Sequence, residues 1–436
     1  MREFQLQFAE PSTVDEQTAK GGLCWLADKD STIKASLANL GHLGPSLGRI
    51  GEAADPNVDF VRIAVAVYAA DRSVPRQSGG SNWNRRSIKV TVPVRALSQW
   101  EASASELEAV VNLLTGDDWT FEFVEDNAPT EMAVDESPPA PARVVLLSGG
   151  ADSAVGALLS RSELKDGERQ ALVSHFNSGV LGPLQRSIAD SIAQLVPGEE
   201  QQHFQFHIGR RGKRLDGVEF ADEQSTRSRS LLFLALGLAV ASVHQVPLWI
   251  PENGFASLNP PLGMERLGSL STRTTHPAFL ADLSSLLNGV GAHGEITNPF
   301  SGNTKGEMFH RVADLIGTSA ATSFLSTTNS CSHTGQRTFK VSSSTPCGVC
   351  FGCVVRRAAF AAAEVPDETQ YIDAADDDKL QAWLDKNSIE EAVRRFVARG
   401  VKSRDVIALS LPSSYSAADA LDLCQRGSQE LGELFA

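Results

Sequence analysis

The sequence predicts an α/β protein whose core is a doubly wound parallel sheet, and three observations support that fold class. From residue 143 onward, short apolar runs alternate with helical patterns, which is typical of strand–helix units in a parallel sheet. The first of these runs leads into a glycine turn that opens a helix. Four of the six cysteines lie between residues 331 and 353, which adds a metal-binding element to the predicted fold.

Shifts in composition divide the chain into four segments. We expect an N-terminal α+β domain over residues 1–125, a proline-rich acidic linker over 126–142, an α/β domain over 143–365 and a small helical region over 366–436. Within the first segment, the patterns predict strands at 60–68, 87–92 and 119–124 and a helix at 107–114. The C-terminal helices are expected to serve packing or an interface rather than chemistry.

The N-terminal segment also carries a polar cluster around one tryptophan. Its members are Asp71, Arg72, Arg76, Trp83, Arg85 and Arg86. Such a cluster suits either a ligand site or a solvated hairpin with the tryptophan packed beneath it, and the residues alone do not decide between the two.

Composition and charge exclude several classes of protein. At 436 residues, with 42% hydrophobic and 21% charged residues, the chain has the make-up of an ordinary soluble protein of two or three domains. A net charge of -14 argues against direct nucleic-acid binding. The longest apolar run, Leu231–Val243, is too short to span a bilayer, so no membrane contact is expected. Clustered cysteines and the lack of a signal pattern predict a cytoplasmic protein.

The glycine turn carries the strongest functional signal. Val144–Leu147 predicts a buried strand, Ser148–Gly150 a tight turn, and the residues from Ala154 onward a helix. This arrangement directs backbone N–H groups and the positive end of a helix to one point, which suits a phosphate chain. Asp152 would repel phosphate, so we expect it to lie on the side of a bound Mg²⁺ or at the start of the helix.

Two later segments are predicted to join this turn in one cleft. Strands at 171–176 and 248–250 end at Asn177–Gly179 and at Glu252–Gly254, and ligands bind beyond the carboxyl ends of parallel strands. The predicted nucleotide-binding residues are Leu147, Ser148, Gly149, Gly150, Asp152, Ser153, Phe176 and Asn177.

The cysteine cluster predicts a structural zinc site. Cys347, Cys350 and Cys353 follow one another at two-residue gaps, and Cys331 supplies a fourth thiolate from an earlier loop. Four protein ligands leave no open coordination position, so the metal is expected to hold structure. An iron–sulfur cluster is the rival, but Arg357 stands where the ferredoxin pattern has its fourth cysteine, which favours zinc.

Several motifs together carry a family resemblance. Ser-Gly-Gly-x-Asp-Ser at 148–153, directly after a strand, resembles the PP-loop of ATP pyrophosphatases. With the cysteine pattern, it is similar to the 7-cyano-7-deazaguanine synthases, the QueC family, over residues 143–365. Further similar stretches are Arg229–Leu234, Ile250–Asn253, Pro299 with Thr304–Glu307, and Ser330–Cys331.

The resemblance implies a Rossmann-like PP-loop fold and a defined activity. Such enzymes use ATP, Mg²⁺ and structural Zn²⁺, activate the carboxylate of 7-carboxy-7-deazaguanine as an acyl-adenylate, and then let ammonia attack. Carried over by position, the catalytic residues are Asp152, Lys305 and Arg229. Taken alone, each of the two cations is as well explained as a surface or helix-capping charge.

The sequence departs from the family in its substrate segment. Thr275–Phe279 lacks the family's aspartate and arginine, so the residue that reads the base is open. The candidates for substrate binding are Arg227, Glu252, Asn253 and Glu265. The N-terminal domain and the helical tail are also foreign to the stand-alone enzyme.

This layout resembles the QueC-like proteins of bacterial antiviral cassettes, the QatC proteins of Qat systems. It implies an anti-phage role with partner proteins and transfer of the deazaguanine to an amine other than ammonia. Two other hypotheses remain open: a PP-loop enzyme for another carbonyl or carboxylate, and a nucleotide-binding scaffold subunit with degraded catalysis. A homo-oligomer is compatible with all of them.

Overall fold

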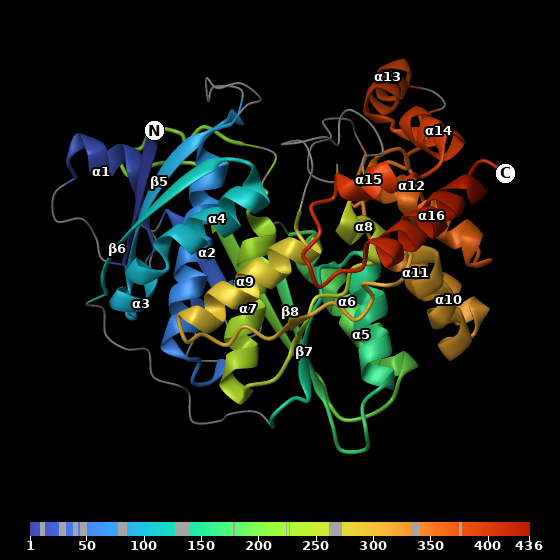
Figure 1. Ribbon diagram of the computed structural model, residues 1–436, viewed down its shortest axis with the longest axis horizontal. Coiled ribbons are helices and arrows are strands. Elements are labelled where there is room, and N and C mark those ends of the chain that lie inside the picture. The colour runs from blue at the N-terminus through green and yellow to red at the C-terminus, as the bar shows by residue number, and fades with distance from the viewer. Residues whose placement is uncertain are drawn as a thin grey trace.

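The computed structural model contains two β-sheets with helices packed around them (Figure 1). It describes residues 1–8, 14–25, 32–37, 42–43, 50–76, 85–126, 139–177, 179–223, 225, 227–260, 273–332, 341–342, 344–374 and 377–436. The chain is an α/β protein with parallel sheets, in agreement with the predicted class.

The first sheet is four-stranded and parallel, in the order β2-β1-β5-β6. Its strands are β1 (Arg2–Gln7), β2 (Gly22–Cys24), β5 (Ser87–Val94) and β6 (Asp118–Glu125). The helices of this region are α1 (Glu16–Gly21), α3 (Leu97–Ala102) and α4 (Ala104–Thr115). The strands predicted at 87–92 and 119–124 and the helix predicted at 107–114 are confirmed.

Residues 60–68 were expected to form a strand, and that prediction is wrong. They lie in the middle of helix α2 (Asp55–Ser73), in which residues 57–71 are all buried. The helix packs against β5 and against helix α7 (Arg229–His244), so apolar side chains surround it and no 3.6-residue period marks the sequence. Pro56 in the first turn is the helix-start signal that the apolar run obscured.

The second sheet is seven-stranded, in the order β11-β10-β7-β8-β9-β3-β4. Its strands are β3 (Ile33–Leu37), β4 (His42–Leu43), β7 (Arg143–Leu146), β8 (Gln170–Phe176), β9 (Gln202–Arg210), β10 (Leu248–Trp249) and β11 (Ile296–Thr297). The five strands from β7 onward pair in parallel, whereas β3 pairs antiparallel with β9. A strand from the N-terminal segment therefore continues this sheet.

Alternate residues of β7 point to opposite faces of the second sheet. Val144 and Leu146 belong to an apolar cluster with α2 and α7, whereas Val145 and Leu147 belong to another with α5 (Ala151–Ser162) and α6 (Leu181–Leu195). Helices therefore cover both faces of the sheet; in Figure 1, α7 lies on one side of β7 and α5 on the other.

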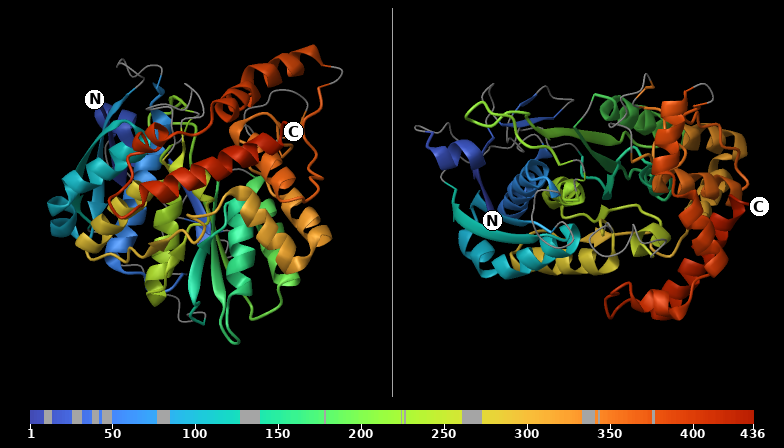
Figure 2. Two further views of the ribbon diagram at one scale, coloured as in Figure 1. Left: turned by 45° about the vertical axis from the view of Figure 1, so that its right-hand side comes forward. Right: turned by 90° about the horizontal axis from the view of Figure 1, so that it is seen from above.

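The chain from residue 254 onward is mostly helical, and helices were expected for residues 366–436 of it. Its helices are α8 (Gly254–Leu258), α9 (Pro277–Gly289), α10 (Lys305–Ile316), α11 (Thr318–Thr327), α12 (Phe351–Ala362), α13 (Asp378–Asn387), α14 (Glu390–Arg399), α15 (Ser403–Ile407) and α16 (Ala417–Glu433). Figure 2 shows the last of them gathered on the side of the molecule away from the N-terminus. Among the described residues, every helix is too short or too polar to cross a bilayer.

Candidate functional site

A cavity of about 570 Å³ lies beyond the carboxyl ends of β7 and β10. It is lined by the turn before α5, the start of α7, residues 250–256, the start of α10, residues 329–332 and the start of α12, together with Leu181 and with Thr274 and Thr275. Its lining includes Ser148, Gly150, Asp152, Ser153, Arg229, Ser230, Glu252, Asn253, Lys305, Ser330 and Cys331.

The turn at 148–153 is closed by its own hydroxyl groups. The backbone N–H of Ser148 donates to Ser153 Oγ (3.1 Å), and the N–H of Gly150 donates to Ser148 Oγ (3.2 Å). Gly149 has a φ of 95°, which a residue with a side chain rarely adopts. Gly150 is the N-cap of α5, so the first turn of that helix, with its partial positive charge, lines the cavity.

Two carboxylates and a lysine meet in the cavity. Lys305 Nζ forms an ion pair with Asp152, and both side chains are nearly buried (6% and 12% exposed). The side-chain amide of Asn253 donates to Asp152 Oδ1 (3.2 Å) and to Glu252 Oε1 (3.3 Å). Burial and the nearby charge of Asp152 raise the pKa of Glu252 well above its ordinary value, against the opposing effect of Lys305.

Arg229 supplies a second cation without a counter-ion. It lines the cavity at the start of α7, and among the described residues no carboxylate forms an ion pair with it. Burial lowers the pKa of its guanidinium, and the nearby Tyr68 opposes that shift. The neighbouring hydroxyl of Ser230 is buried and, within the same part of the chain, has no hydrogen-bond partner. Both groups are placed to receive an anionic ligand.

Some of the predicted residues do not line this cavity. Leu147 is fully buried in the core, and Phe176 packs against His207 at 5.1 Å between ring centroids. Asn177 donates to the hydroxyl of Tyr68 (2.9 Å), and the Arg227 guanidinium donates to the carbonyl of Thr115 (2.9 Å). Glu265 and Ser178 lie outside the described residues.

Three members of the polar cluster in the N-terminal segment, Asp71, Arg76 and Arg86, belong to a buried ion-pair network, whereas Arg85 pairs with Asp118 at the surface. Arg86 is 1% exposed and lies between Asp71 and Asp117, with 2.6 Å to Asp117 Oδ2. Arg76 pairs with Asp117 (2.7 Å), and Asp71 also accepts hydrogen bonds from the backbone and hydroxyl of Ser228. No sequence pattern pointed to Asp117, which directly precedes strand β6. Trp83 lies outside the described residues.

The four cysteines come together as the spacing predicts, and they could hold a metal such as zinc. The sulfur atoms of Cys331, Cys347, Cys350 and Cys353 all lie within 4.8 Å of one another. The N–H of Cys350 points at the sulfur of Cys347 (3.4 Å), and such hydrogen bonds favour the thiolate form that binds metal.

The cysteine cluster is tied directly to the glycine turn, a link that sequence analysis missed. The backbone N–H of Asn329 donates to the carbonyl of Gly149 (3.0 Å), and the N–H of Ala151 donates to Ser330 Oγ (3.4 Å). Gly352, next to Cys353, lies so close to the Ser330 carbonyl that a Cβ would stand 2.0 Å from its oxygen. The loop that brings Cys331 to the cluster therefore also braces the turn.

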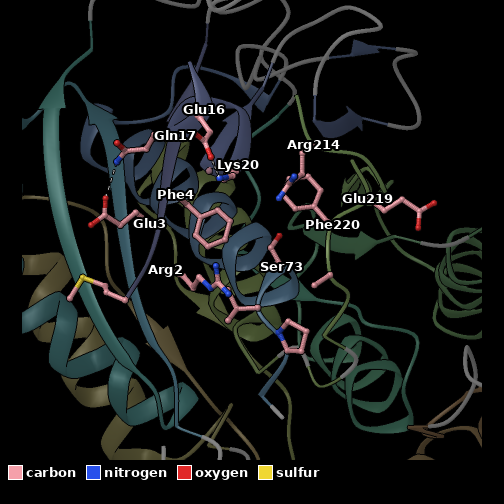
Figure 3. Close-up of a pocket in the computed structure, with 15 residues that line it drawn as sticks. Arg2, Glu3, Phe4, Glu16, Gln17, Lys20, Ser73, Arg214, Glu219 and Phe220 are labelled. Carbon is pink, nitrogen blue, oxygen red and sulfur yellow. Dashed lines mark hydrogen bonds and ion pairs between the residues drawn. The ribbon is translucent and has the colours of Figure 1, made fainter. Parts of the chain in front are cut away.

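A second cavity, of about 650 Å³, lies between β1, α1 and residues 214–221 (Figure 3). Among the charged residues that line it, Lys20 pairs with Glu16, and Arg214 pairs with Asp216 just outside the cavity (2.6 Å). The amide of Gln17 donates to Glu3 (3.1 Å), as the dashed line in the figure marks. The cavity at the glycine turn is the better candidate site, because it brings the start of a helix together with Lys305, Arg229 and a carboxyl group, that of Glu252, whose pKa is strongly raised.

No protein-family model matches the chain, and neither a curated protein nor a solved structure matches it.

Proposed function

We propose that this chain is a PP-loop ATP pyrophosphatase similar to the QueC family, which transfers AMP from ATP to the carboxylate of a 7-deazaguanine acid. The proposal is supported mainly by the meeting of the 148–153 turn with Lys305, Asp152 and Arg229 in one cavity, where Arg229 has no ion pair with any residue that the structure describes. A site for a nucleoside triphosphate needs backbone amides and cations to bind the phosphates. It also needs carboxylates to bind the metal ion that accompanies the phosphates.

The residues of the cavity suit both ATP and Mg²⁺. Asp152 and Glu252 offer the carboxylate oxygens that Mg²⁺ prefers, and Asn253 holds the two side chains together. Mg²⁺ in this place would neutralise phosphate charge when the nucleotide binds. Arg229, the hydroxyl of Ser230 and the first turn of α5 are left for the phosphate oxygens.

The reaction joins two anions, so its main need is charge stabilisation. An oxygen of the substrate carboxylate attacks the α-phosphorus, the bond to the β-phosphate oxygen breaks, and the products are an acyl-adenylate and pyrophosphate. Lys305 and Arg229 hold the departing pyrophosphate as its charge grows. An amine then attacks the acyl carbon, a proton is lost, and AMP leaves, which yields an amide; no covalent bond to the protein is required.

The wider role rests on the layout of the chain. A chain that carries an N-terminal segment and a helical tail in addition to the residues of this cavity suits a QueC-like protein of an antiviral cassette, in which the acyl group passes to an amine, including one on a partner protein. The cysteine cluster serves as a structural zinc site beside the turn. We place this activity in the cytoplasm, where ATP and reduced thiols are available.

Pyrophosphate release tests the proposal directly. The full chain is incubated with ATP, Mg²⁺ and 7-carboxy-7-deazaguanine, and the expected result is release that depends on the acid. ATP binding without release for any acid favours the alternative, a nucleotide-binding scaffold subunit. Release with an unrelated acid alone assigns the chain to another PP-loop activity.

Asp152→Asn is the matching variant. We expect pyrophosphate release to fall by at least about 100-fold, because the substitution removes the counter-ion of Lys305 and a carboxylate oxygen from the metal side of the cavity. Circular dichroism should show an intact fold. Asp166→Asn, at an exposed position outside the cavity, is the control and should keep full activity. An active Asp152→Asn protein would refute the role given to this residue.

A further inference from the structure

The C-terminal helix α16 lies against the segments that form the candidate cavity. It contacts α8, which follows Glu252 and Asn253, and α12, whose first turn lines the cavity. Gly427 packs so closely on α8 that a Cβ would stand 2.3 Å from the ring of Phe255. Helix α16 therefore packs closely against two helices that adjoin the cavity, α8 and α12.

Glu430 of this helix reaches the start of α10. Its side chain is 8% exposed and accepts a hydrogen bond from the backbone N–H of Gly306 (2.8 Å). Gly306 leaves the necessary room, since a Cβ there would stand 2.7 Å from Glu430 Oε2. Burial raises the pKa of Glu430 to about 7, although Thr304, the Gly306 amide and Lys305 all oppose the shift. A carboxylate at this end of α10 also complements the helix dipole.

Arg426, one turn earlier on α16, holds the other side of the same helix start. Its guanidinium pairs with Glu307 and donates to the carbonyl of Gly302 (3.0 Å). Glu307 forms a capping box with Thr304 at the N-terminus of α10. Two residues of α16 thus make polar contacts with the start of α10, and Lys305 directly precedes Gly306 and Glu307, the residues of the first turn that they contact.

We propose that Glu430 is a positioning residue that sets the first turn of α10 so that Lys305 meets Asp152 in the cavity. This assigns the helical C-terminal region to the catalytic apparatus, whereas the sequence suggested only packing or an interface. The inference rests on the proposed function in one respect, that Lys305 acts on the phosphates of a bound nucleotide. The placement of Lys305 itself does not depend on that function.

Three variants test the proposal. Glu430→Ala removes the acceptor for the Gly306 N–H, whereas Glu430→Gln keeps an acceptor oxygen of the same reach. Glu433→Ala, at an exposed position on the same helix, is the matched control. The measurements are hydrogen exchange of the amides of residues 304–308 and the kcat and KM of pyrophosphate release.

In Glu430→Ala we expect exchange of the Gly306 amide to rise about tenfold, since its hydrogen bond to a carboxylate is lost. We also expect kcat to fall about tenfold at an unchanged KM for the acid, because the group that holds pyrophosphate is misplaced while acid binding is untouched. Glu430→Gln should restore most of both quantities, and the control should match the wild type. If Glu430 only stabilised the fold, its replacement by alanine would lower the melting temperature but would not lower kcat at an unchanged KM.

The exchange measurement separates failure of this inference from failure of the proposed function. If the wild-type chain releases no pyrophosphate, the proposed function fails, and hydrogen exchange still tests the contact. Unchanged exchange and unchanged kcat in Glu430→Ala would overturn the inference. Equal impairment of the alanine and glutamine variants would overturn it as well, since the hydrogen bond would then not be what positions Lys305.

Discussion

Asn253 fixes the relative positions of the two carboxylates in the cavity. Its side chain is fully buried, its amide nitrogen donates to Asp152 and to Glu252, and its carbonyl oxygen accepts from the N–H of Ala256 (2.8 Å) at the start of α8. A neutral donor shared by two acids offsets part of their mutual repulsion. One residue thus joins a helix cap to the geometry of the candidate site.

The buried side chain of His175 is expected to make the stability of the protein depend on pH. The ring is buried, with Nε2 2.9 Å from the carbonyl of Ile208, and burial lowers its pKa from 6.5 to about 3, with a further contribution from Arg229. Burial also lowers the pKa of His203 to about 4. Below pH 6.5 the unfolded chain binds protons that the folded chain does not, so stability is complete above that pH and falls on acidification.

We expect the free energy of unfolding to drop by up to about 1.4 kcal/mol per pH unit for each of these histidines between pH 6 and 4. Urea denaturation at several pH values measures it. His175→Gln keeps a donor for the Ile208 carbonyl and should flatten the pH profile. His310→Gln, at an exposed position, should leave the profile unchanged. A profile of His175→Gln as steep as that of the wild type would contradict the assignment.

Site residues that belong to a local motif could be predicted from the sequence, whereas residues that contact the site from a distant position in the chain could not. Ser148 and Ser153 line the cavity, because a glycine turn after a strand can be recognised within a few neighbouring residues. Arg229 and Lys305 line the same cavity, but they were predicted only from their positions in the family resemblance. Glu430 could not be predicted in this way. Its contact with Gly306 joins positions 124 residues apart, and a buried polar pair leaves no periodic pattern in either segment.

Among the elements, the cysteine cluster and the glycine turn behave as one unit. Cys331 follows Asn329 and Ser330, which hydrogen-bond to the turn, and Cys353 lies in the first turn of α12. A metal at the cluster would therefore fix the distance between α12 and the start of α5. The spacing of the cysteines predicted the cluster, whereas its link to the turn depends on backbone groups that any residue carries.

We expect one zinc ion per chain, and its removal should loosen this unit. Chelation at neutral pH should lower the melting temperature by more than about 5 °C, since metal binding contributes to folding free energy. Cys350→Ser should lose the metal, whereas Cys424→Ser, a buried thiol outside the cluster, should keep it. Elemental analysis and thermal denaturation measure both effects. Iron in place of zinc, with visible absorption, would overturn the zinc assignment.

For the whole molecule, the N-terminal segment and the second sheet share one core. Strand β3 extends that sheet beside β9, and α2 packs along α7 within a single apolar cluster. The sequence predicted the strand–helix alternation of residues 143–365 but not this joining, because β3 is short and weakly patterned and α2 resembled a strand. Pairing between distant strands is decided by burial in the folded molecule and not by local propensity.

The shared core predicts that the segment beyond residue 142 does not fold by itself. A chain of residues 143–436 would expose the part of α7 that α2 covers, on a helix that is buried throughout residues 234–242, and would leave β9 as an open edge. We expect it to aggregate or to lack a cooperative thermal transition.

Co-expression with residues 1–126 should restore a soluble complex that elutes at the size of the full chain, because the contacts between the two parts are those of a domain interior. Size-exclusion chromatography and calorimetry measure both outcomes. A monomeric 143–436 fragment that melts cooperatively at the temperature of the full chain would mean that the N-terminal segment is an independent domain. The position of Arg229, at the start of the helix that α2 covers, would then not depend on that segment.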